Sequence, residues 1–101
     1  MRQATAETLA ADLAGAKFVI LDFSSPGCTP CKRIPAQIEE LLTQLGDLPI
    51  KAYEIDIVAQ PDIARHYFVL GVPTLILFCE GREIARFNSV PKKEKWLSLL
   101  R

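Results

Sequence analysis

A short run of this chain is apolar on both of the faces that a β-strand presents. Residues 18–23 read Phe-Val-Ile-Leu-Asp-Phe, and only Asp22 in this run is polar. A strand with one face in water alternates apolar and polar residues, whereas a strand covered on both sides is apolar throughout. The run therefore predicts a central strand of a parallel sheet with helices packed above and below it.

The rest of the chain alternates in the same way, and Gly or Pro stands at many of the boundaries. Thr5 is a suitable cap for the first helix, and Pro35 predicts a bend or a late start in the second. The early crossovers favour parallel strands, and the turn Glu80-Gly81 predicts a final antiparallel hairpin. We expect an α/β fold with a mixed central sheet of four or five strands between two helical layers. The predicted helices are 5–14, 34–45, 61–67 and 91–100, and the predicted strands are 18–23, 50–57, 74–78 and 82–87.

Size and charge narrow the class of protein. The chain has 101 residues, half of them hydrophobic, so we expect one domain spanning residues 1–101 and a monomer. Twelve basic and twelve acidic residues cancel, which argues against nucleic acid or an anionic membrane as a partner. The longest apolar runs are too short to span a bilayer. The N-terminal residues include acids and no compact apolar segment, so we expect a cytoplasmic protein without a signal peptide.

Two cysteines, Cys28 and Cys31, follow the buried strand at its predicted junction with a helix. Thiols are kept reduced in the cytoplasm, so this spacing indicates redox or metal chemistry before a structural bridge. A helix N-terminus stabilises a thiolate, the form of cysteine that attacks a disulfide. Cys28 would attack, and Cys31, one turn later and more buried, would displace the product. Pro30 between them suits the first turn of a helix.

Asp22 and Pro73 are two further candidates for the site. A carboxylate in an apolar strand is costly unless it is paired or protonated. Asp22 therefore either exchanges a proton with Cys31, or caps a turn or meets a lysine. Proline at the head of a strand is tolerated, and trans is the common state of the Val72–Pro73 bond.

Other chemistry-bearing residues have simpler interpretations. Cys79 is expected to be a small buried apolar residue, and His66 a surface residue of a helix. A zinc site that combines them with Cys28 and Cys31 matches no standard spacing.

Taken together, these motifs resemble the thioredoxin family. The resemblance covers nearly the whole chain, in the family's order, and CxxC with the later Val-Pro-Thr segment is its most specific part. The segments that carry it are Val19–Phe23, Cys28-Thr29-Pro30-Cys31-Lys32, Glu54-Ile55-Asp56, Gly71–Phe78 and Glu80-Gly81.

The resemblance implies a function. It implies reduction of protein disulfides, with no cofactor beyond a redox-active Cys28–Cys31 disulfide, and re-reduction by a dithiol protein or a flavoprotein reductase. It also implies that Asp22 is the buried acid and that Pro73 is a cis-proline beside the cysteines. The residues expected to hold the substrate are Val72, Pro73, Thr74, Gly27, Thr29 and Pro30.

The chain departs from the family around this site. Gly27 stands where a tryptophan is usual, and Ser24 where an aromatic residue is common. Ala52 stands where many members have a lysine that partners the buried aspartate, and Lys51 would point to the opposite face of its strand. These changes suggest a distinct set of partners. A binding module or redox sensor with little turnover, and a metal site at the CxxC, are the alternative functions.

Overall fold

A five-stranded sheet crosses the middle of the computed structural model, which describes residues 1–100. The strand order is β1-β3-β2-β4-β5, with β3 parallel to both β1 and β2, and β4 antiparallel to β2 and β5. The mixed sheet predicted from the sequence is therefore present with five strands. These are β1 (Arg2–Gln3), β2 (Phe18–Ser24), β3 (Ile50–Asp56), β4 (Thr74–Cys79) and β5 (Arg82–Phe87).

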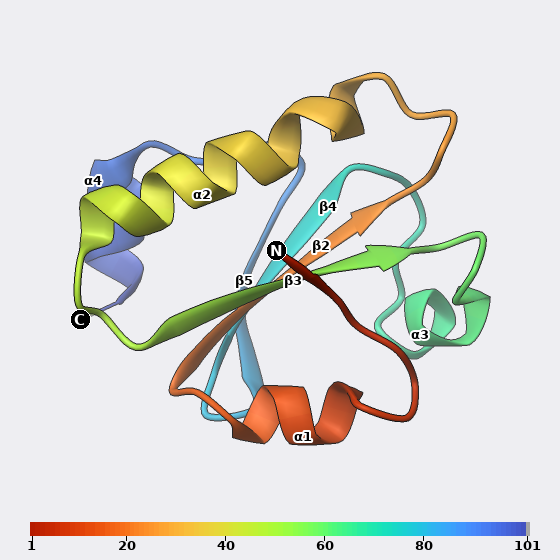
Figure 1. Cartoon of the computed structure of the whole chain (residues 1–101), viewed down its shortest axis with the longest axis horizontal. Helices are drawn as coiled ribbons and strands as arrows, with labels where there is room; N and C mark the ends of the chain where they lie inside the picture. The colour runs from red at the N-terminus through yellow and green to blue at the C-terminus, as the bar shows by residue number, and fades with distance from the viewer. Residues whose placement is uncertain (101) are drawn as a thin grey trace.

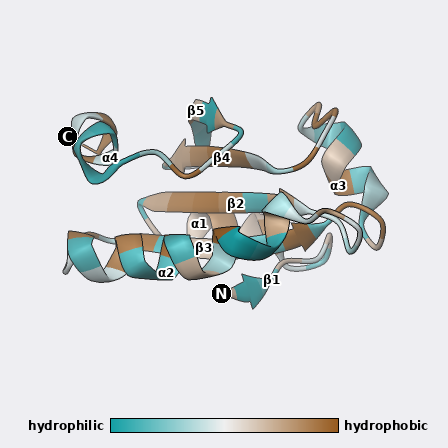
Figure 2. Ribbon diagram, turned by 90° about the horizontal axis from the view of Figure 1, so that it is seen from above, coloured by the Kyte–Doolittle hydropathy of each residue, from teal (hydrophilic) through white to brown (hydrophobic). Residues whose placement is uncertain are grey.

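Helices cover both faces of the sheet, as Figure 1 shows. One face is covered by α1 (Leu9–Ala14) and α3 (Pro61–His66), and the other by α2 (Ile34–Leu45) and α4 (Lys93–Leu99). A short 3₁₀ helix, η1 (Pro30–Arg33), leads directly into α2. In Figure 2 the layers are seen from above, and the most apolar ribbon lies in the central strands.

The central strand β2 is buried along its whole length, as its sequence predicts. Val19, Leu21 and Phe23 pack into the core beneath α1 and α3. Phe18 and Ile20 pack into the core beneath α2 and α4. Since side chains alternate along a strand, Asp22 and Ser24 lie on the second of these faces, below the start of α2.

The ends of several elements differ from those predicted. Thr5 does not cap α1, which begins at Leu9, because its carbonyl closes a preceding turn by accepting the Thr8 and Leu9 N–H groups. The prediction of a late start near Pro35 is confirmed, since η1 precedes α2. At the N-terminus, β1 is a two-residue edge strand.

Trp96 anchors α4 to the sheet. Its side chain is fully buried, its indole N–H donates to the Pro91 carbonyl at 2.9 Å, and its ring lies 5.7 Å from that of Phe87.

We predict that Trp96→Ala lowers the free energy of unfolding by about 3–5 kcal/mol, because it leaves a cavity in the core. Leu97 is the matched control: it is 39% exposed, and Leu97→Ala is expected to cost about 1 kcal/mol or less. Urea unfolding of both variants measures the difference, and equal losses would contradict this account.

Candidate active site

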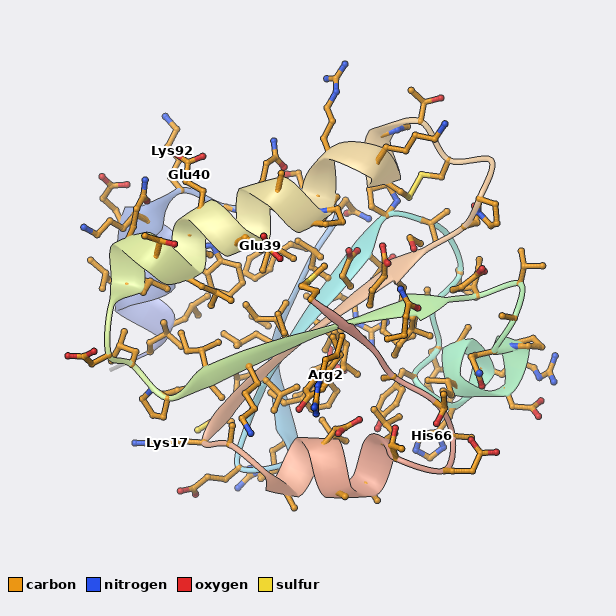
Figure 3. All side chains as sticks on the ribbon, viewed as in Figure 1. Arg2, Lys17, Glu39, Glu40, His66 and Lys92 are labelled. Atoms are coloured by element: carbon orange, nitrogen blue, oxygen red, sulfur yellow. A yellow bond between two sulfur atoms is a disulfide. The ribbon has the colours of Figure 1, made fainter. Side chains whose placement is uncertain are left out.

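The two cysteines lie just beyond the C-terminal end of β2 and are joined in a disulfide. Their sulfurs are 2.08 Å apart and their Cα atoms 5.3 Å apart. Cys28 lies in the loop after β2, and Thr29 leads into η1, in which Pro30 is the first residue. Figure 3 shows the disulfide as a yellow bond near the start of the helical segment that continues into α2.

The two sulfur atoms have different surroundings. Cys31 is 3% exposed, whereas Cys28 is partly exposed. The backbone N–H of Cys31 donates to the sulfur of Cys28 at 3.2 Å. A hydrogen bond from a backbone N–H, together with the start of a helix, stabilises negative charge on that sulfur. The arrangement therefore favours Cys28 as the attacking thiolate.

The segment around Pro73 lies next to this loop, at the same end of the sheet. Thr74, the first residue of β4, pairs with Phe23 near the end of β2. The Val72–Pro73 peptide bond is cis, and the Thr74 hydroxyl donates to the Gly71 carbonyl at 2.6 Å. Val72 and Pro73 are half-buried, so part of each is open to a bound chain.

Asp22 lies beneath the cysteine loop. It is 0% exposed, and neither carboxylate oxygen has a hydrogen-bond partner among residues 1–100. Burial, and secondly the charge of Glu54, raise the pKa of Asp22 from 3.8 to about 7. Lys51 lies on the other side of the sheet, with its ammonium 3.9 Å from where a Cβ on Gly15 would be. No lysine of β3 therefore pairs with Asp22.

A polar pocket of about 370 Å³ opens beside Cys31. It lies on the α2 face of the sheet, between the start of α2 and the ends of β2 and β3. Its lining includes two carboxylates, Glu54 and Asp56, and the hydroxyl-bearing residues Ser24 and Ser25. The pocket gives the buried side of the dithiol a route to water.

The rim of the site is partly open and partly apolar. Gly27, Thr29 and Pro30 are exposed, and a Cβ on Gly27 would meet nothing within 4 Å. On the loop between α3 and Pro73, Phe68 is 79% and Leu70 98% exposed.

Arg86 of β5 secures that loop. Its guanidinium donates to the carbonyls of Tyr67 and Phe68 at 2.7 and 3.2 Å, and it pairs with Glu83. The sequence did not reveal Arg86, Phe68 or Glu54 as part of this region. The only sequence signals for this region are two apolar residues, Phe68 and Leu70, just before Gly71, and a glutamate in the predicted strand 50–57.

The remaining candidates lie apart from the dithiol. Cys79, predicted to be buried, is a free thiol that is partly exposed at the end of β4, where the strand reaches the surface. His66 is exposed on α3 with its ring 4.7 Å from that of Tyr67 (Figure 3). Within residues 1–100 no three His, Cys, Asp or Glu side chains are grouped so as to hold a metal ion. None of the helices described over the same residues is long and apolar enough to cross a membrane.

A five-stranded sheet with a dithiol after its central strand and a cis-proline beside it defines the class of dithiol–disulfide exchange proteins. Comparison with known proteins supports this class. The thioredoxin family model matches residues 1–101. A thioredoxin of Chlamydia trachomatis is 32% identical over 99% of this chain and 96% of its own length. One of Mycolicibacterium smegmatis is 34% identical over 81% of this chain and 75% of its own length.

Solved structures give the same result. A mutant thioredoxin from Halobacterium salinarum superposes with a TM-score of 0.77 at 25% identity, covering 98% of this chain and 84% of that one. The chain belongs to the thioredoxin family and is a thiol–disulfide oxidoreductase that reduces protein disulfides. Members of this family need no cofactor beyond the two redox-active cysteines.

The raised pKa of Asp22 predicts how stability depends on pH. Folding favours the protonated carboxyl, so the stability present below pH 3.8 is lost as the pH rises toward about 7. The Asp22→Asn variant has no such group. Its free energy of unfolding relative to the wild type should therefore rise by as much as about 4 kcal/mol between pH 4 and pH 8. Urea unfolding of both proteins at the two pH values measures this, and a pH-independent difference would contradict it.

Proposed function

We propose that Cys28 is the attacking sulfur of this oxidoreductase, that Cys31 is the resolving sulfur, and that Asp22 is the acid–base group of the second step. The observation that carries this proposal is the asymmetry of the pair. Cys28 is partly exposed and accepts a backbone N–H, whereas Cys31 is buried on the side of the sheet that holds Asp22. A substrate disulfide can reach the first sulfur but not the second.

The chemistry then proceeds in two displacements. In the reduced protein the Cys28 thiolate attacks one sulfur of a substrate disulfide, and the other sulfur leaves as a thiolate that takes a proton from water. Cys31 gives its proton to the Asp22 carboxylate and attacks Cys28. The mixed disulfide breaks, the second substrate sulfur leaves as a thiolate, and the Cys28–Cys31 disulfide retains the two oxidising equivalents. A dithiol of the reductase reverses both steps.

The substrate is expected to bind as an extended segment against Val72, Pro73 and Thr74. This segment enters β4 beside the cysteine loop, and its first residues are half-buried rather than covered. Gly27, Thr29 and Pro30 would form the opposite side of the groove. The exposed Phe68 and Leu70 add apolar surface next to it, which favours a protein partner over a small thiol.

The partners are disulfide-containing proteins and a thioredoxin reductase, as the family implies. We further propose that the protein acts as a monomer in the cytoplasm. The reducing thiol–disulfide potential there keeps such a dithiol reduced and able to react. Neither nucleic acid nor a membrane is expected to take part, since the charges of the chain cancel.

Serine variants of the two cysteines test the assignment of roles. Cys28→Ser is expected to abolish reduction of insulin disulfides, because the attacking sulfur is lost. Cys31→Ser should still attack but fail to resolve, so that a mixed disulfide with the substrate accumulates. Non-reducing electrophoresis and mass spectrometry detect it, with Cys79→Ser as the control that retains full turnover. A Cys28→Ser protein as active as the wild type would disprove the proposal.

A second variant tests the open rim. The space beside Gly27 accommodates a large side chain, so Gly27→Trp should fold normally and add an apolar contact to a bound protein segment. Such a contact is worth about 1 kcal/mol, which corresponds to roughly a five-fold rise in kcat/KM for insulin. Gly27→Ser supplies a side chain without the aromatic surface and is the control. An unchanged kcat/KM in Gly27→Trp would show that substrates do not contact this position.

A further inference from the structure

Glu54 places a second carboxylate beside the buried Asp22. It pairs in register with Asp22 across the parallel strands β2 and β3. Partners in register on adjacent strands, about 4.8 Å apart, point their side chains to the same face. Glu54 therefore lies on the α2 side of the sheet, with Asp22 and Cys31.

The hydrogen bonds of Glu54 place its carboxylate at the boundary between the buried acid and water. One oxygen accepts from the Ser24 hydroxyl at 3.4 Å, and the other from the side-chain amide of Gln3 on β1. Ser24 is buried and Glu54 is half-buried, and both line the pocket beside Cys31. Asp22 lies near both of them, fully buried and without a hydrogen-bond partner among residues 1–100.

The other charged groups near Asp22 are either engaged elsewhere or exposed. Asp56 lines the same pocket, but its carboxylate accepts the backbone N–H groups of Val58 and Ala59 at 2.8 and 3.3 Å. Lys32, on η1, lines the pocket as an exposed side chain. From β4, Asp22 meets Leu75, which carries no charge. Glu54 is thus the charged residue of β3 that pairs in register with Asp22.

We propose that Glu54 is a positioning residue of this oxidoreductase, which controls the proton on Asp22 and passes it between that carboxyl and the solvent in the pocket. The inference rests on the proposed role of Asp22 and adds the residue through which that role is exercised. When Cys31 attacks Cys28, its proton moves to Asp22, then by way of Glu54 and pocket water to bulk solvent. When the disulfide is reduced, the same proton returns by the reverse route.

Electrostatics explains why a carboxylate is effective in this position. Two like charges on adjacent strands cannot both be ionised cheaply, so the negative charge of Glu54 favours the protonated form of Asp22. A lysine in its place would do the opposite and hold Asp22 ionised. Because Glu54 is half-buried and lines the pocket, its carboxylate is open to the pocket, whereas Asp22 is fully buried.

The decisive experiment measures the ionisation of Asp22 itself. In oxidised full-length protein labelled with ¹³C at aspartate carboxyls, the chemical shift of Asp22 is followed against pH, and Asp22→Asn identifies its resonance. Glu54→Gln keeps the size and removes the charge, while its carbonyl oxygen can still accept from Gln3 and its amide can donate to the Ser24 hydroxyl. The midpoint for Asp22 is expected to fall below the wild-type value of about 7. Glu54→Asp should restore a midpoint close to that of the wild type.

Glu40→Gln is the matched control, because Glu40 lies on the outer side of α2 near Lys92 (Figure 3). It changes the net charge by the same amount and should leave the Asp22 midpoint in place. A midpoint that does not move in Glu54→Gln, or that moves equally in Glu40→Gln, overturns the proposal. If Glu54 only anchored β1 through Gln3, the midpoint would not move.

Kinetics tests the second half of the proposal. Release of the first product depends on Cys28, so in the Cys31→Ser background the rate at which reduced protein forms a mixed disulfide should be unchanged by Glu54→Gln. In the protein with both cysteines, the rate of the resolving step is measured as a function of pH. Glu54→Gln should shift the acid limb of this pH–rate profile to lower pH and lower its plateau several-fold. An unchanged plateau excludes Glu54 from proton transfer and overturns the proposal. The midpoint measurement needs no turnover, so it stays informative even if Cys28→Ser shows the proposed function to be wrong.

Discussion

The complete burial of β2 is the constraint on which the rest of this structure depends. All seven of its residues are shielded from water, and its two sets of alternating side chains belong to two separate cores. A strand in this position needs a neighbour on each edge and a helical layer on each face, which the five-stranded sheet and four helices supply. It ends at Ser24, and the loop that follows it brings Cys28 to the surface.

The same burial gives the site its chemistry. Asp22 lies in β2, where an ionised carboxylate is poorly solvated, so its pKa rises to about 7. A group with that pKa accepts and returns protons under ordinary conditions, whereas an exposed aspartate would remain ionised. The energetic cost of this residue falls on the stability of the fold, because the protein keeps a carboxyl where an apolar side chain would pack better. If Asp22 is the proposed acid–base group, stability and reactivity are coupled through this one side chain.

The surface around the site determines which molecules it meets. Phe68 and Leu70 expose apolar side chains in the loop before Gly71, and Arg86 of β5 donates to the carbonyls of Tyr67 and Phe68. The opposite side lacks the tryptophan that is usual before the first cysteine, and Gly27 leaves open space there. The exposed apolar surface near the dithiol therefore lies on its α3 side.

Much of this protein could be predicted from the amino-acid sequence because the information is local. The apolar run at residues 18–23 predicts a covered central strand, and the spacing of Cys28 and Cys31 predicts a dithiol at the start of a helix. The start of α1 was placed too early, because Thr5 closes a turn through its carbonyl instead of capping through its side chain.

What only the tertiary structure decided is which residues meet across strands. The register of β2 with β3 sets Glu54 beside Asp22, and a change of one residue would have placed Tyr53 or Ile55 there instead. That register depends on the packing of both cores at once, and no pattern within a single segment contains it.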